Sequence, residues 1–145
     1  MSKRLAELAL FDLLVAGEKI RKVVSSFSSA EELKYDFMAW DTVIREFEII
    51  GEAMRGLIDA GFFDSEQRTV VDFRNVLIHE YFGIEAEEVW SISDRPLREL
   101  LEKTRKKIER IDSDLKKELL DELIAENAHL PFIVEVLASL DLSKN

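Results

Sequence analysis

The stretch FMAWDTVIREFEIIGEAMRGLI, residues 37–58, contains the most regular pattern of the chain. Its apolar positions recur three and four residues apart, so they share one face of an α-helix. The residues of this face are Phe37, Trp40, Ile44, Phe47, Gly51, Met54 and Ile58. Such a seam is typical of a helix in a bundle, where Gly51 would let another helix approach closely. We therefore expect one long helix over about residues 30–60, packed along this seam.

A row of charged residues lies beside the seam, again three and four positions apart. Its members are Asp41, Arg45, Glu48 and Glu52. One interpretation is a ladder of ion pairs on the helix surface, each worth about 0.2–0.5 kcal/mol. The other interpretation is a polar wall that faces a site. The sequence leaves both open.

The rest of the chain also favours helices. Two prolines and five glycines interrupt it, and no segment alternates apolar and polar residues as a strand does. Ser29 is a predicted N-cap, with Glu32 completing a capping box. Beyond the long helix, the expected helices cover about residues 3–24, 65–82, 85–92, 95–111, 115–127 and 131–140. The sequence thus predicts an all-α fold, an up-and-down helical bundle.

The chain of 145 residues suits one hydrophobic core. The letters DSD at residues 112–114 restart the chain after the last helix of the expected bundle. We therefore expect a bundle domain over residues 1–111 and an appended C-terminal helical extension over residues 112–145. The sequence assigns no role to this extension.

Composition narrows the class of protein. The formal net charge of −10 argues against a general nucleic-acid coat but leaves room for a local basic site. The absence of cysteine excludes disulfides and thiolate metal sites. No apolar run approaches the roughly 18 residues of a membrane span. The basic and then apolar N-terminus lacks a small-residue cleavage site, so we interpret it as the first helix. These features fit a cytoplasmic protein without a membrane partner.

The segment RNVLIHEY, residues 74–81, places polar side chains inside an apolar helix pattern. On a helical wheel Arg74 falls within the apolar sector and lies about 20° from Tyr81, whereas Asn75 and His79 lie on a polar stripe. Each residue alone has a plain explanation: an arginine that reaches water, a surface histidine, a core tyrosine. Their combination points instead to a site. Because Arg74 and His79 diverge by about 140°, a twofold interface would help to join them, and we expect a homodimer.

At these residues the sequence resembles the HepT-like branch of the HEPN superfamily. Arg74, His79 and Tyr81 match that family's R-x-x-x-x-H-x-Y pattern, and Asn75 stands in the usual place. IIGEAM at residues 49–54 resembles the family's second-helix signature, and VW at residues 89–90 resembles its next landmark. The resemblance covers roughly residues 5–111.

The resemblance implies a HEPN-like homodimeric bundle that is the toxin of a type VII HepT/MntA-like toxin–antitoxin system. It implies a metal-independent ribonuclease without a cofactor, with the choice between tRNA and mRNA left open. The implied partner is an MntA-like minimal nucleotidyltransferase antitoxin, which silences the toxin by adding AMP to Tyr81. The implied catalytic residues are Arg74 and His79, with Asn75 in support.

The chemistry of these residue types agrees with that expectation. Without a metal, RNA cleavage uses the neighbouring 2′-hydroxyl as nucleophile, a histidine moves the proton, and an arginine fork stabilises the phosphate. The alternative is a non-catalytic HEPN module that binds a nucleotide or its partner, and a purely structural helical protein is a third possibility. RNA cleavage in EDTA separates the first two.

Overall fold

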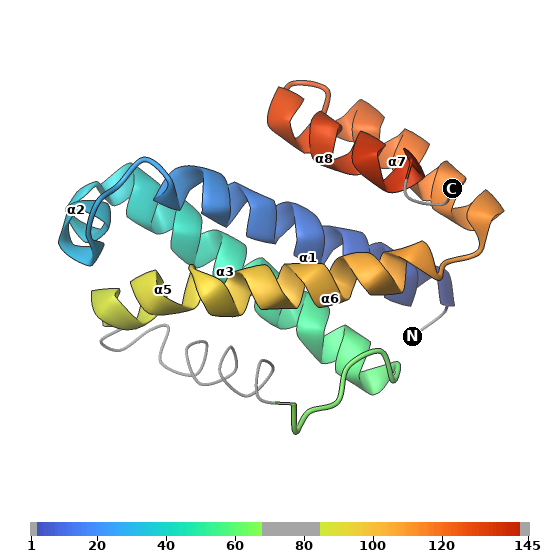
Figure 1. Ribbon diagram of the computed structural model, residues 1–145, viewed down its shortest axis with the longest axis horizontal. Helices are drawn as coiled ribbons and strands as arrows, with labels where there is room; N and C mark the ends of the chain where they lie inside the picture. The colour runs from blue at the N-terminus through green and yellow to red at the C-terminus, as the bar shows by residue number, and fades with distance from the viewer. Residues whose placement is uncertain (1–2, 68–84, 143–145) are drawn as a thin grey trace.

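The computed structural model describes residues 3–67 and 85–142 (Figure 1), with the side chains of residues 3, 4 and 142 left out of the description. Every regular element in these ranges is an α-helix, and they contain no strand. The all-α fold predicted from the sequence is therefore confirmed. None of the described helices is both long enough and apolar enough to cross a membrane.

The centre of the bundle is α1 (Lys3–Val24), which packs on both α3 (Phe37–Asp59) and α6 (Arg95–Glu109). Figure 1 shows α3 and α6 running in the opposite direction to α1. Fully buried side chains from all three helices fill the space between them, among them Leu10, Leu13, Leu14, Val43, Ile50, Leu57, Leu97 and Leu100. The helix expected over residues 3–24 is thus the element on which the others assemble.

The expected long helix over residues 30–60 is interrupted, so this prediction was wrong in one respect. The structure has α2 (Ala30–Tyr35) and then α3, with Asp36 between them at φ −90° and ψ 97°. The Asp36 carboxylate accepts a hydrogen bond from the backbone N–H of Ala39 at 3.0 Å and so caps α3. An aspartate side chain can compete with the helix for backbone donors, which lets the chain turn here. The turn allows α2 to pack on both α3 and α5 (Ala86–Ile92).

The predicted cap of α2 forms. Ser29 Oγ accepts from the backbone N–H of Glu32 at 3.2 Å. The Glu32 carboxylate in turn accepts from the backbone N–H of Ser28 at 2.9 Å, one residue before the position expected for a capping box. The two bonds satisfy backbone N–H groups at the start of α2.

The buried face of α3 differs from the expected seam. The buried residues are Val43, Glu46, Phe47, Ile50, Ala53, Met54 and Leu57. Phe47 and Met54 belong to both sets, whereas Phe37 of the expected seam is 72% exposed and Trp40 and Ile44 are half-buried. The apolar arc of α3 contains two overlapping seams with three- and four-residue spacing. Packing against α1 selects the second, which periodicity alone could not distinguish from the first.

A close approach between helices occurs at Gly17, where α1 meets α6. A Cβ atom added at Gly17 would overlap Cδ2 of Leu101 and would lie 3.0 Å from its Cδ1. Leu101 is buried, so its side chain has little room to move.

We therefore expect Gly17→Val to lower the free energy of unfolding by about 1–3 kcal/mol, the usual cost of overpacking a core. Urea denaturation followed by circular dichroism measures it. Adding Leu101→Ala should recover part of the loss, since the two side chains would then no longer compete for space. Strict additivity of the two substitutions would contradict this account.

The C-terminal part of the chain forms a pair of helices, α7 (Ser113–Glu126) and α8 (Pro131–Leu142). The two pack on each other, and α8 also contacts α1 and α6. The Nζ of Lys22 on α1 lies 5.5 Å from the centre of the Phe132 ring on α8. The division of the chain at residues 111 and 112 stays a prediction. The buried residues of this pair, however, join the same hydrophobic cluster as α1.

Candidate functional site

The four predicted site residues lie outside the described residues. Arg74, Asn75, His79 and Tyr81 all fall between residues 68 and 84, so their assignment stays a prediction. We call residues 68–84 the motif segment. The structure describes the chain on both sides of it. On one side is the turn after α3, and on the other is α5.

The turn after α3 is a well-formed helix stop. Gly61 has φ +84°, a conformation that side chains disfavour. The backbone N–H of Phe62 donates to the carbonyl of Leu57 at 2.8 Å, and that of Gly61 donates to Ile58 at 3.0 Å, which together make a Schellman motif. Phe63 follows and is buried. Backbone hydrogen bonds therefore fix the direction in which the chain leaves α3.

The next residues form a turn and not yet a helix. Asp64 Oδ1 accepts from the backbone N–H of Glu66 at 2.9 Å, and the Asp64 carbonyl accepts from the N–H of Gln67 at 3.1 Å. This arrangement is typical of an aspartate turn. The helix expected from Ser65 has thus not begun by Gln67.

After the motif segment, the next described helix is α5, which is anchored in the core. Val89 is buried, while its neighbour Trp90 is half-buried. Ser93 Oγ donates to the Val89 carbonyl at 2.6 Å, which ties the end of α5 to its own last turn. The VW landmark of the sequence thus combines one core residue with one residue that reaches a groove.

This groove lies between the end of α1, α5 and the start of α6, and it encloses about 660 Å³. Its lining includes Arg21, Phe27, Trp90 and Arg98. Each arginine has a carboxylate from its own helix region beside it: Arg21 Nη1 is 3.4 Å from Glu18 Oε1, and Arg98 Nη2 is 3.6 Å from Asp94 Oδ1. The groove therefore combines aromatic surface with positive charge that is largely balanced.

The structure shows how exposed the charged row beside the expected seam of α3 is. Asp41, Arg45 and Glu52 are exposed and Glu48 is half-buried. No ion pair within the part of the chain that the structure describes joins two of these four residues. The interpretation as an ion-pair ladder thus gains no support, and the polar wall stays open.

A buried carboxylate lies elsewhere on α3, at Glu46, which the sequence analysis did not single out. Burial raises the pKa of the Glu46 carboxyl above its ordinary value, although the charges of Lys19 and Arg45 lower it in part. A raised pKa in the folded chain means that protonated Glu46 favours folding. That contribution is complete below the unfolded pKa and is lost as pH rises through the folded value.

We therefore expect Glu46→Gln to change how stability depends on pH. The difference in unfolding free energy, variant minus parent, should become more favourable to the variant as pH rises from about 4 to 7. Urea denaturation at a series of pH values measures it. Glu52→Gln, an exposed change on the same helix, is the matched control. A difference that is flat across this range would contradict the prediction.

The sequence analysis also left a local basic site open without locating one. The structure places exposed or half-buried cations on the last turns of α6 and at its C-cap, at Lys103, Lys106, Lys107 and Arg110. The letters KTRKKIER at residues 103–110 were the available signal. The number of basic residues in this segment does not show which of them form ion pairs in the folded chain.

Comparison with known proteins finds a family match that covers most of the bundle. The family described as "Ribonuclease HepT-like" matches residues 13–107. These residues extend from α1 into α6 and include the whole RNVLIHEY segment. The match ends before α7 begins.

Two proteins of Methanocaldococcus jannaschii are similar to the chain. "Putative RNase MJ1380" is 31% identical over 112 residues, which are 75% of this chain and 98% of that protein. "Putative RNase MJ0127" is 33% identical over 95 residues, which are 63% of this chain and 78% of that protein. No solved structure matches the chain.

Proposed function

The chain belongs to the HepT-like ribonuclease family, and we propose that it is a metal-independent ribonuclease, the toxin of a type VII HepT/MntA-like toxin–antitoxin pair acting in the cytoplasm. The observation that carries this proposal is the extent of the family match. It covers residues 13–107 and so contains Arg74, Asn75, His79 and Tyr81 in their motif order.

The proposed reaction is attack by an RNA 2′-hydroxyl on the adjacent phosphorus. The bond from the 2′-oxygen to phosphorus forms, and the bond from phosphorus to the 5′-oxygen breaks. His79 moves the proton that leaves the 2′-hydroxyl and that the 5′-oxygen finally receives. Arg74 holds the phosphate through its planar fork and stabilises the negative charge that grows on the phosphate oxygens. Asn75 orients the phosphate or His79.

The proposal includes a homodimer. One straight helix would aim Arg74 and His79 about 140° apart, so a second copy across a twofold axis supplies the complementary pair. Sedimentation of the purified chain at micromolar concentration tests this, and we expect a dimer. A monomer under these conditions would remove the composite site.

The proposal also includes regulation by a partner. An MntA-like minimal nucleotidyltransferase is proposed to transfer AMP from ATP to the hydroxyl of Tyr81, releasing pyrophosphate. The added phosphate brings negative charge and bulk next to the RNA-binding residue Arg74. The wheel supports this, since Tyr81 and Arg74 point about 20° apart.

The decisive experiment is RNA cleavage by the purified full-length chain in the presence of EDTA. We expect cleavage to continue and to leave a cyclic phosphate at the 2′- and 3′-oxygens. Activity that disappears with EDTA and returns with a divalent metal would contradict the metal-free reaction. A chain that binds nucleotide or the partner without cutting RNA would favour the non-catalytic module instead.

A further inference from the structure

The helix α6 and its C-cap carry a charge opposite to that of the chain as a whole. Residues 95–110 contain seven Lys and Arg against three Glu, which gives +4. Because the whole chain is at −10, the other residues together carry −14. Positive charge is thus concentrated on one helix of an acidic protein.

Ion pairs within the fold neutralise only part of this charge. Arg95 Nε lies 2.9 Å from Glu99 Oε1, and Arg98 lies 3.6 Å from Asp94. Arg105 Nη2 lies 3.6 Å from Glu18 Oε1 on α1, so this arginine is used in the contact between the two helices. The N-terminal half of α6 and the side that faces α1 are therefore balanced.

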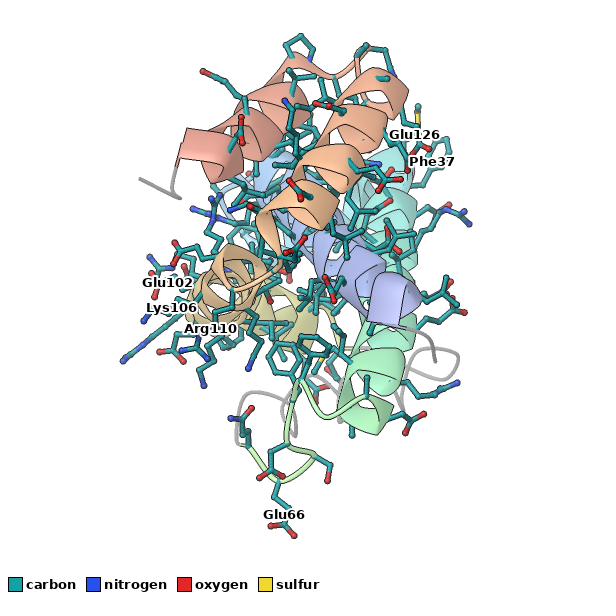
Figure 2. All side chains as sticks on the ribbon, turned by 90° about the vertical axis from the view of Figure 1, so that its right-hand side faces the viewer. Phe37, Glu66, Glu102, Lys106, Arg110 and Glu126 are labelled. Carbon is teal, nitrogen blue, oxygen red and sulfur yellow. The ribbon has the colours of Figure 1, made fainter. Side chains whose placement is uncertain are left out.

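The remaining four cations form what we call the α6 basic cluster: Lys103, Lys106, Lys107 and Arg110. Within the described ranges, 3–67 and 85–142, none of them has an ion pair. Lys103, Lys106 and Arg110 are exposed, and the spacing of three and four residues keeps the cluster on one side of the helix. Figure 2 shows Lys106 and Arg110 in a row with Glu102 at one edge of the molecule.

Lys107 connects this cluster to the turn that leads into the motif segment. Its Nζ lies 5.0 Å from the centre of the Phe63 ring, close enough for a cation–π contact. Burial lowers the pKa of Lys107 below its ordinary value, and the charges of Arg110 and Lys103 lower it further. The cations are therefore crowded against one another, and a bound anion would relieve that repulsion.

We propose that the α6 basic cluster binds phosphates of the RNA substrate. The contact of Lys107 with Phe63 places the cluster beside the turn after α3. In the sequence this turn precedes residues 68–84, which contain Arg74 and His79. Phosphate contacts of this kind supply affinity and position without reading sequence. This inference rests on the proposed ribonuclease function and adds a substrate-binding surface to it.

RNA fits the cluster better than an acidic protein does. Protein interfaces have a partly apolar centre surrounded by polar residues. The exposed large apolar side chains of the described residues are Leu5, Tyr35, Phe37 and Met38, and none belongs to α6. Exposed cations that have no ion pair among the described residues are instead suited to a phosphate backbone.

The test compares two triple variants that remove the same charge. Lys103→Gln, Lys106→Gln and Arg110→Gln change the cluster but keep Lys107, which packs on Phe63. The control is Arg55→Gln, Arg95→Gln and Lys117→Gln, all exposed and outside the cluster. Both are made in a His79→Ala chain, so that labelled single-stranded RNA stays intact while its binding is measured at several salt concentrations.

We expect the cluster variant to bind RNA about tenfold more weakly or worse at low salt, and the control to bind like its parent. Each phosphate contact contributes about 0.7 to the slope of log affinity against log salt, so the slope should fall by about two. Equal affinity and slope in the two triple variants would overturn the proposal. Unchanged RNA binding with lost binding to the nucleotidyltransferase would assign the cluster to the protein partner and would also overturn it.

Cleavage is measured in parallel in chains that keep His79, which separates this inference from the proposed function. If RNA is cleaved but both triple variants bind it equally well, the phosphate-binding role of the cluster is rejected and the ribonuclease function stands. If RNA binds through the cluster but is never cleaved, the ribonuclease function is rejected and the RNA-binding role of the cluster stands.

Discussion

We expect His79→Ala to lower the rate of RNA cleavage by about 10²–10⁴-fold, the usual contribution of a positioned general acid or base. Alanine cannot take the proton from the 2′-hydroxyl or return one to the leaving oxygen. The chain has one other histidine, and it provides the control. His129 is exposed in the turn between α7 and α8, so His129→Ala should leave cleavage unchanged.

Arg74 is tested in the same assay. Arg74→Ala should also lose most of the activity, because the charge that develops on the phosphate then lacks its partner. Arg74→Lys should recover little of it, since an ammonium group cannot reproduce the planar fork. Circular dichroism and sedimentation of each variant distinguish a loss of chemistry from a loss of folding or assembly. Full cleavage by a folded His79→Ala protein would refute the assigned role.

The second large effect concerns silencing through Tyr81. After co-expression with the nucleotidyltransferase, intact-mass spectrometry should show the added mass of one or more AMP units, and peptide mapping should place them on Tyr81. The modified protein should lose RNA cleavage, because the added phosphate competes with RNA for Arg74. Tyr81→Phe should keep most of the nuclease activity and should escape silencing, since the hydroxyl has no part in the cleavage step.

The chain's other tyrosine tests whether the modification is specific. Tyr35 is 81% exposed, so a transferase that modifies any accessible tyrosine would modify it. Tyr35→Phe should therefore be silenced as the parent is. AMP found on Tyr35, or a silenced complex in which Tyr81 is unmodified, would contradict the proposal. The latter result would point to inhibition by a partner that blocks access of RNA to Arg74 and His79.

The features predicted well from sequence are those that depend on neighbouring residues. The bounds of α1 and the Ser29 cap follow from spacing and from the short reach of a hydroxyl to the third residue. Asp36 shows the limit of this approach. Its carboxylate can lie on a helix surface or can cap a new helix, and the packing of α2 on α5 decides between these.

Burial on α3 required the tertiary structure. Two apolar seams overlap on this helix and share Phe47 and Met54, and both have helical spacing. Contact with α1 buries one and leaves Phe37 of the other exposed. Periodicity reports that an apolar face exists, but its exact direction depends on a partner that is distant in sequence.

The sequence by itself determined the helical class, the motif at Arg74, His79 and Tyr81, and the family to which the chain belongs. Local propensity, capping and the order of side chains along one segment are enough for these. Only the tertiary structure decided which positive charges of α6 are available. Glu18 reaches Arg105 from another helix, while Lys107 meets Phe63 from a distant turn. Electrostatic interactions depend on distance in space, and the order of residues does not specify that distance until the helices have packed.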